Sequence, residues 1–138
     1  MRSIEVIGRG VCVKDHHLLV YQNMRYGYFC LPGGHVEWEE RIEAAIRREW
    51  QEEVGCDCRV GEFLKHFESF FEREGKRHHH CVFLHRVTCD AVDVHQPLRR
   101  MEPHIALQWL PIEQISTCSF ISKEQQDFLC EYVKSLTC

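Results

Sequence analysis

The chain has 138 residues, 44% of them hydrophobic, which fits one domain with a single core over residues 1–138. Its formal net charge of −4 excludes a general attraction to polyanions, so we expect no nucleic-acid partner. No stretch reaches the roughly 18 apolar residues of a membrane span. Glu5 interrupts the first apolar run, so the N-terminus lacks the pattern of a signal peptide, and we expect a cytoplasmic protein without a membrane partner.

The first part of the chain is predicted to form strands. Residues 4–13 are rich in β-branched types, and Gly8 and Gly10 within them indicate a bend or bulge. A second strand is expected over residues 17–22, in which the apolar run starts at Leu18. A short apolar strand over residues 28–31 runs into a Pro-Gly-Gly turn signal.

A helix is predicted from about Glu39 to Val54, because these residues are good helix formers without Gly or Pro. Gly55 then supplies a helix stop, and Glu39 and Glu40 suit the positive end of the helix dipole.

The second half of the chain is predicted to hold a hairpin, one more strand and a final helix. Strands over residues 59–71 and 78–88 flank a polar turn. A strand at 104–110 and a short helix from Pro111 precede an amphipathic helix at 122–136. This order of elements predicts a mixed sheet flanked by helices, in the α/β (α+β) class.

Three glutamates of the predicted inner helix fall on one side of it. Glu49, Glu52 and Glu53 are three and four residues apart, and Glu49 and Glu53 lie within roughly 40° of Ile42 and Ile46 on the helical wheel. Carboxylates at the edge of an apolar face repel one another and are costly to bury, and a hard cation such as Mg²⁺ relieves both costs. The plain alternative is a glutamate-rich helix that only faces solvent.

The full spacing decides between these alternatives. The stretch from Gly34 to Cys56 matches the Nudix box, G-x5-E-x7-R-E-U-x-E-E-x-G-U, at every fixed position, so the chain resembles the Nudix hydrolase family. The segments FCLPGG before the box and WLPI near the last strand are also similar to the family's. At two hydrophobic positions of the box this chain departs mildly from the family, with Trp50 bulkier and Cys56 smaller than the usual aliphatic residue. The resemblance implies an α/β/α sandwich over nearly the whole chain.

The resemblance also implies roles for individual residues. Glu52 and Glu53 would be metal ligands for Mg²⁺ or Mn²⁺, and Glu49 would be a third ligand or the base that activates water. The backbone carbonyl of Gly33 would be a further ligand, and Glu40 and Arg48 would brace the loop and the helix.

Other residues complete the candidate site. Glu102 is our candidate for an additional catalytic acid from the loop before the last strand, with Asp93 second, against the alternative of an ordinary exposed loop acid. Arg25, Phe29 and Arg48 are the candidates for substrate contact, although core packing is an alternative for the aromatic residue.

The implied activity is metal-dependent hydrolysis of a diphosphate bond in a nucleoside diphosphate derivative or a nucleoside triphosphate, by attack of water. The expected partner is a small nucleotide substrate, and a homodimer is left open. The alternative function is a nucleotide-sensing module with the same fold and little turnover, a class that tends to lose the glutamates present here. The sequence does not name the substrate.

Cysteine and histidine are unusually frequent. The nine cysteines show no CxxC spacing, so we expect reduced, mostly buried thiols and not a structural zinc site. His78 and His80 share one face of a predicted strand, with His79 on the other. This pair could bind zinc or a substrate phosphate, or could simply lie on the sheet surface.

Overall fold

The computed structural model describes residues 2–136, and residues 1, 137 and 138 lie outside the described part. In chain order its elements are β1 (Ile4–Val11), β2 (Val13–Lys14), β3 (His17–Asn23), β4 (Phe29–Cys30), β5 (Gly33–His35), α1 (Ile42–Glu53), β6 (Arg59–Arg73), β7 (Lys76–Thr88), β8 (Ile105–Pro111), the 3₁₀ helix η1 (Ile112–Thr117) and α2 (Lys123–Leu136). The expectation of one domain over residues 1–138 stays a prediction.

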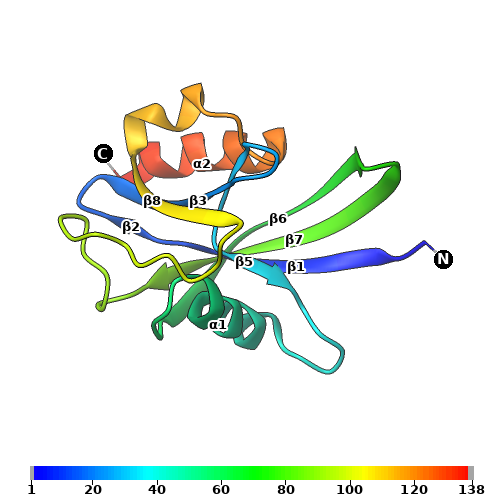
Figure 1. Ribbon diagram of the computed structural model, residues 1–138, viewed down its shortest axis with the longest axis horizontal. Helices are drawn as coiled ribbons and strands as arrows, with labels where there is room; N and C mark the ends of the chain where they lie inside the picture. Colours follow the sequence, from blue (N-terminus) through cyan, green and yellow to red (C-terminus); the bar gives the residue numbers. More distant parts are fainter. Residues whose placement is uncertain (1, 137–138) are drawn as a thin grey trace.

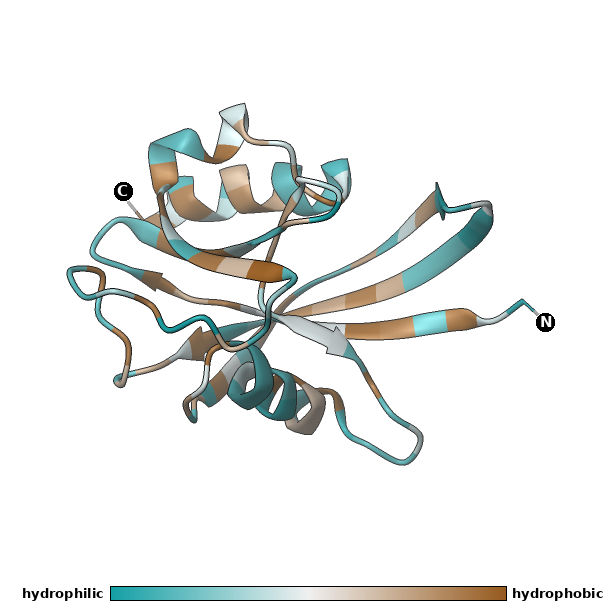
Figure 2. Ribbon diagram, viewed as in Figure 1, coloured by the Kyte–Doolittle hydropathy of each residue, from teal (hydrophilic) through white to brown (hydrophobic). Residues whose placement is uncertain are grey.

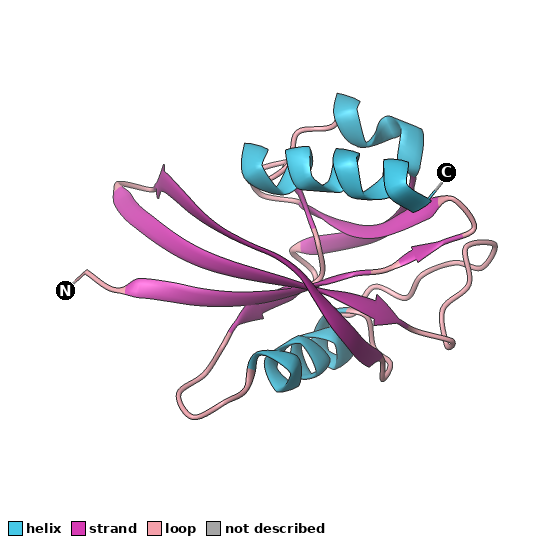
Figure 3. Ribbon diagram, turned by 180° about the vertical axis from the view of Figure 1, so that it is seen from behind, coloured by secondary structure: helices cyan, strands magenta, loops and turns pink. Residues whose placement is uncertain are grey.

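The described strands form two sheets. The first has the order β5-β1-β7-β6, in which β1 runs parallel to β7 and the other neighbours are antiparallel. In the second sheet, β3 pairs with β2, β4 and β8. Helix α1 and helix α2 lie on opposite sides of the strands (Figures 1 and 3). The expected mixed sheet flanked by helices, in the α/β (α+β) class, is confirmed.

The main core lies between the two sheets and α2. It buries alternate side chains of β1, β3 and β7 against the apolar face of α2, while a second cluster joins α1 to the far side of the first sheet. Hydrophobic segments lie along the strands, whereas α1 displays mostly hydrophilic residues (Figure 2). The most completely buried members of the two clusters include Ile7, Leu18, Leu31, Leu84 and Leu129 in the first and Leu19, Ile46 and Trp50 in the second.

The glycines of β1 serve packing, and the strand has no bulge at these positions. The register of β1 against β7 is continuous from Ile4 to Val11. A Cβ atom on Gly8 would lie 3.0 Å from the Ile46 side chain, and one on Gly10 would lie 2.9 Å from the Trp50 ring. The two glycines therefore allow α1 to lie close against the sheet.

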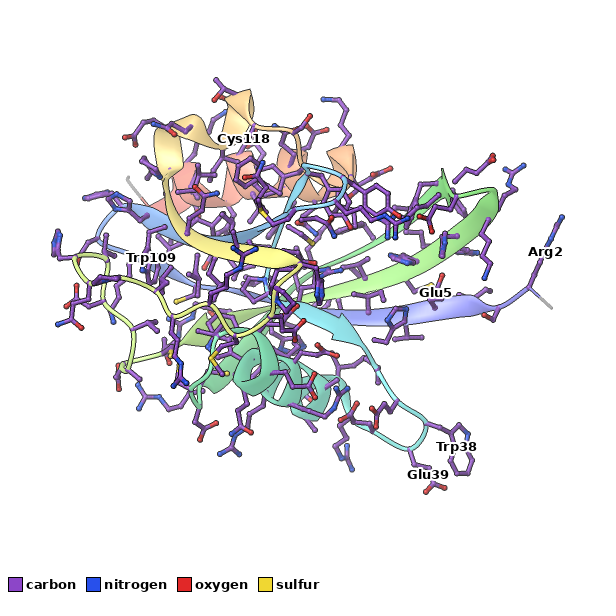
Figure 4. The ribbon with its side chains drawn as sticks, in the orientation of Figure 1. Arg2, Glu5, Trp38, Glu39, Trp109 and Cys118 are labelled. Atoms are coloured by element: carbon purple, nitrogen blue, oxygen red, sulfur yellow. The ribbon has the colours of Figure 1, made fainter. Side chains whose placement is uncertain are left out.

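Helix α1 begins later than the sequence predicted. It starts at Ile42, and Glu39 has a left-handed backbone with φ of +60°. Trp38, 89% exposed, and Glu39 project from the loop between β5 and α1 (Figure 4). The assignment of Glu39 and Glu40 to the first helical turn is therefore wrong, because Glu40 instead turns back to bind Arg48.

The hairpin is longer than predicted, and one strand was missed. Strands β6 and β7 pair up to Arg73 and Lys76, so only Glu74 and Gly75, both with positive φ, form the turn. The Pro-Gly-Gly signal is followed at once by β5, whose Gly33 and Gly34 pair with β1. The remaining predicted elements are present with ends shifted by one or two residues.

The cysteines of the described chain are unbonded thiols. Four of them are buried and four are only partly buried, fewer than the mostly buried thiols that were expected, while Cys138 lies outside the described residues. Within residues 2–136, no helix combines the length and the apolar character needed to cross a bilayer.

Candidate active site

Helix α1 presents its three box glutamates to one pocket at three different depths. Ala45, Ile46 and Trp50 anchor the inner face of the helix in the core. Glu53 lies about one helical turn after Trp50 and is only 7% exposed. The side chain of Glu49 is 17% exposed, and that of Glu52 is 52% exposed. The carboxylates thus run from the buried edge of the core to solvent.

The double glycine of β5 brings these carboxylates close to the backbone. A Cβ atom on Gly34 would lie 2.7 Å from the carboxylate of Glu49. Gly33 has φ of +147°, and a Cβ atom there would lie 2.2 Å from the carbonyl oxygen of Gly8. The Gly33 amide donates a hydrogen bond of 2.7 Å to Oε1 of Glu53. Only glycine permits both approaches at these positions.

Arg9 lies beneath Glu53 and was missed in the sequence. This side chain of β1 is 6% exposed, and its Nη1 donates to the carbonyl oxygens of Leu31 at 2.9 Å and Gly33 at 3.3 Å. Burial opposes its charge, but nearby acidic groups, Glu53 among them, raise the pKa of the Arg9 guanidinium. The one sequence signal for this residue is a charge alternating with apolar residues on the inner face of a strand.

Burial makes the inner carboxylates reluctant to ionise. Desolvation raises the pKa of Glu53 to about 8, although Arg9 and the Gly33 amide favour the anion, and Glu49 and Glu102 add repulsion. Desolvation also raises the pKa of Glu49, against the opposing effect of Arg48. A cation bound among these oxygens would remove this penalty.

Arg48 braces the loop before the helix and the helix itself. Its Nε and Nη2 donate to the two carboxylate oxygens of Glu40, both at 2.9 Å, and its Nη1 donates to Glu49 at 3.1 Å. The bidentate hydrogen bonds from Arg48 lower the pKa of Glu40 to about 2. Arg48 also contacts Glu52 at 3.5 Å. This side chain therefore orients carboxylates, and the geometry favours its bracing role over a substrate contact.

The carboxylates of Glu49, Glu52 and Glu53 line one pocket of about 340 Å³. It also contains Glu102, the loop acid expected to contribute, whereas Asp93 lines a different pocket and accepts a hydrogen bond from the backbone of His95. The pocket's charged and aromatic lining is drawn from both sheets, α1 and the loop before β8: Glu5, Arg9, Tyr21, Tyr28, His35, Glu49, Glu52, Glu53, Arg73, His78, His80, Glu102 and His104.

Two of the expected substrate contacts lie elsewhere. Arg25 forms an ion pair with Glu74, and Phe29 packs against Phe120 and the main core, so neither lines the pocket. Tyr28 and Arg73 line the pocket instead of Phe29 and Arg25. Nη2 of Arg73 donates a hydrogen bond to the hydroxyl of Tyr28 at 3.0 Å.

Histidines form one wall of the pocket. His78 and His80 both face it, as their alternation predicted, and His79 pairs with Glu68 on the other side of the sheet. Desolvation lowers the pKa of His80 to about 4, so this ring is neutral at neutral pH. Glu5 and His35, neither of which was predicted as a site residue, lie against these rings.

The donor set of α1 and β5 fits a hard divalent cation. Carboxylate oxygens and a backbone carbonyl are the ligands that Mg²⁺ and Mn²⁺ prefer. Desolvation raises the pKa values of Glu49 and Glu53 even though Arg48, Arg9 and the Gly33 amide favour the anions, so a bound cation would further stabilise the charged forms.

Comparison with known proteins agrees with this fold, a mixed α+β arrangement with a carboxylate-bearing helix at its pocket. Residues 5–132 match the family model described as the NUDIX domain. The chain therefore belongs to the NUDIX domain family. This confirms the resemblance seen in the sequence and the expectation of a Nudix-type pyrophosphohydrolase.

Solved structures show the same fold at low sequence identity. The MutT protein from Methanosarcina mazei is 19% identical, with a TM-score of 0.71, over 99% of this chain and 98% of that one. A NUDIX hydrolase from Nitrosomonas europaea is 19% identical, with a TM-score of 0.72, over 96% and 90% of the two chains. An Ap4A hydrolase from C. elegans is 18% identical, with a TM-score of 0.68, over 97% and 98%.

Proposed function

We propose that this protein hydrolyses the diphosphate bond of a nucleoside diphosphate derivative or a nucleoside triphosphate, using Mg²⁺ or Mn²⁺. The observation that carries the proposal is the buried Glu53 carboxylate, held by the Gly33 amide in a pocket that also contains Glu49, Glu52 and Glu102. Among the similar structures, the one named an Ap4A hydrolase supports a nucleotide substrate.

The metal would be held by Glu49, Glu52, Glu53 and the carbonyl oxygen of Gly33. When bound, it would neutralise charge on the diphosphate oxygens and lower the pKa of a bound water. The hydrogen bond from the Gly33 amide fixes one carboxylate oxygen of Glu53 and thereby also sets the direction of the other oxygen. Arg48 holds Glu49 and limits its rotation. Two of the three carboxylates are thus held by hydrogen bonds from the protein before a cation binds.

The reaction requires one water molecule and no covalent enzyme intermediate. The oxygen of water bonds to one phosphorus, the bond from that phosphorus to the bridging oxygen breaks, and the water proton passes to a carboxylate. Glu49 and Glu102 are the candidate bases in the pocket. Arg73, at the Tyr28 side of the pocket, is the candidate for contact with a phosphate or a base.

A panel of nucleotide derivatives, assayed with Mg²⁺ or Mn²⁺ and with a chelator, tests the proposal. We expect hydrolysis of at least one diphosphate compound, no turnover after chelation, and poor hydrolysis of phosphomonoesters. In ¹⁸O-labelled water, a single label should appear on one phosphate product. Cleavage of monoesters alone, or a trapped phosphoryl-enzyme, would contradict the proposal.

Matched variants of α1 connect the activity to the site. We expect Glu52→Gln and Glu53→Gln to lose at least about a hundredfold in rate while remaining folded, because each removes charge stabilisation of several kcal/mol. Glu43→Gln, on the exposed side of the same helix, should keep the parental rate. Comparing Glu49→Gln with Glu102→Gln, at saturating metal, identifies the base. Binding of nucleotides without any turnover would favour the sensing module.

A further inference from the structure

Four side chains from the neighbouring strands β5, β1 and β7 meet on one wall of the pocket that also contains the glutamates of α1. His78 and His80 alternate on β7, so both point to the same face of the sheet. Glu5 of β1 lies directly beside His80 in the parallel register. His35 of β5 is paired with Ile7, two residues after Glu5 and on the same face. Figure 4 shows Glu5 on β1.

The carboxylate of Glu5 is the centre of this histidine cluster, which consists of Glu5, His35, His78 and His80. One oxygen of Glu5 lies 2.7 Å from Nε2 of His35. The other lies 2.8 Å from Nδ1 of His78 and 3.5 Å from Nε2 of His80. Ligand atoms of Glu5, His78 and His80 all lie within 4.8 Å of one another, which is a separation that one metal ion spans.

The rings of the cluster are held in place by packing. Phe71, opposite His78 on β6, stacks on the His78 ring at 4.9 Å and meets the His80 ring edge-on at 4.8 Å. The side chain of His80 is 9% exposed, that of Glu5 21% and that of His78 25%. Little rotamer freedom is therefore left to lose on binding, whereas His35, at 64%, can move in to complete a site.

The donor chemistry of this cluster differs from that of α1. Imidazole nitrogens with one carboxylate suit Zn²⁺ and related transition metals, whereas Mg²⁺ prefers oxygen. We propose that Glu5, His78 and His80, completed by His35, bind a transition-metal dication of the Zn²⁺ class at a second metal site in the pocket. This site is built from strands alone and does not depend on the proposed function.

A second group of potential ligands provides an internal control. Glu68 of β6 and His79 and Cys81 of β7 lie on the opposite face of the sheet and also bring three ligand atoms within 4.8 Å of one another. Glu68 is 49% exposed and His79 is 30% exposed, so this group is less enclosed than the histidine cluster. His79 stands between His78 and His80 in the sequence, which makes its substitution a matched control.

The test is a Co²⁺ titration of the full-length, metal-free protein under a non-chelating reductant, followed by visible absorption. We expect one Co²⁺ with the ligand-field bands of nitrogen and oxygen ligands, displaced by equimolar Zn²⁺ but not by excess Mg²⁺. The bands should persist in the Glu52→Gln and His79→Gln variants. Binding should weaken at least tenfold in His80→Gln and in the isosteric Glu5→Gln.

Each variant is first compared with the parent by thermal melting without metal, and His78→Gln replaces any variant that does not fold. Persistence of the Glu52→Gln signal separates this site from the proposed catalytic one. Loss of Co²⁺ binding in His79→Gln but not in His80→Gln would place the site on the opposite face of the sheet and overturn the proposal. Sulfur-to-cobalt charge-transfer bands, no bands at all, or equal binding by every variant would also overturn it.

Discussion

Replacement of Glu53 by glutamine isolates the cost of the buried carboxylate. The pKa of Glu53 rises from 4.5 to about 8 in the folded protein, mainly through desolvation. In the unfolded chain this group ionises near pH 4.5, so between the two values only the unfolded state loses the proton. The stability of the metal-free protein therefore falls as pH rises through this window and levels off above about pH 8.

The size of the effect follows from the shift. A difference of 3.5 pH units (8 − 4.5) corresponds to about 5 kcal/mol, an order-of-magnitude value. Glutamine keeps an oxygen for the Gly33 amide but does not titrate. We expect Glu53→Gln to become more stable relative to the parent by up to about 5 kcal/mol between pH 4.5 and 8.5.

Urea denaturation of chelator-treated, reduced protein at several pH values measures this difference. Other titrating groups are shared by the two proteins, so the difference between their curves reports on Glu53. Addition of Mg²⁺ at pH 8 should stabilise the parent more than the variant, since the cation binds the ionised form. Parallel curves for parent and variant across the whole range would show that the carboxylate carries no such penalty.

Three further substitutions test the geometry around the helix. Gly34→Ala should lower turnover at least about tenfold with the fold kept, because the added Cβ would lie 2.7 Å from the Glu49 carboxylate; a parental rate would contradict this. Gly10→Ala should destabilise the protein by about 1–3 kcal/mol in urea denaturation, since the methyl group meets the Trp50 ring, and an unchanged midpoint would refute the close packing. Arg48→Lys keeps the charge but not the bidentate geometry, so we expect about a tenfold loss in kcat with a similar melting temperature, and full activity would show that orientation is unimportant.

The sequence predicted the fold class and most elements because their patterns are local. The apolar spacing of α1 and α2, and the turn residues between the strands, identify each element without knowledge of its partners. Errors arose where tertiary contacts override local propensity. Glu39 and Glu40 favour a helix, yet Glu40 is captured by Arg48 eight residues later, which keeps this segment outside the helix. Gly8 suggested a bulge, whereas it serves the approach of α1.

The residues of the candidate site also divide into those with a local sequence signal and those without a clear one. The glutamates of α1 were found because their spacing is local, and Glu102 was found by its place in a loop. Arg9 and Glu5 were missed, because a single charged residue among the apolar positions of a strand is a weak signal that does not identify its partners. Their importance comes from the β1 register, which the sequence does not encode locally.

The parallel pairing of β1 with β7 has a consequence for how the protein is made. Glu5 and Arg9 are synthesised early, but His78 and His80 emerge only after α1 and the whole of β6. Strand β1 occupies the position between β5 and β7, so without β7 one of its two edges has no hydrogen-bonding partner. A nascent chain that ends before β7 therefore carries α1 without the histidines of β7, and the pocket is complete only when the β6–β7 hairpin has paired with β1.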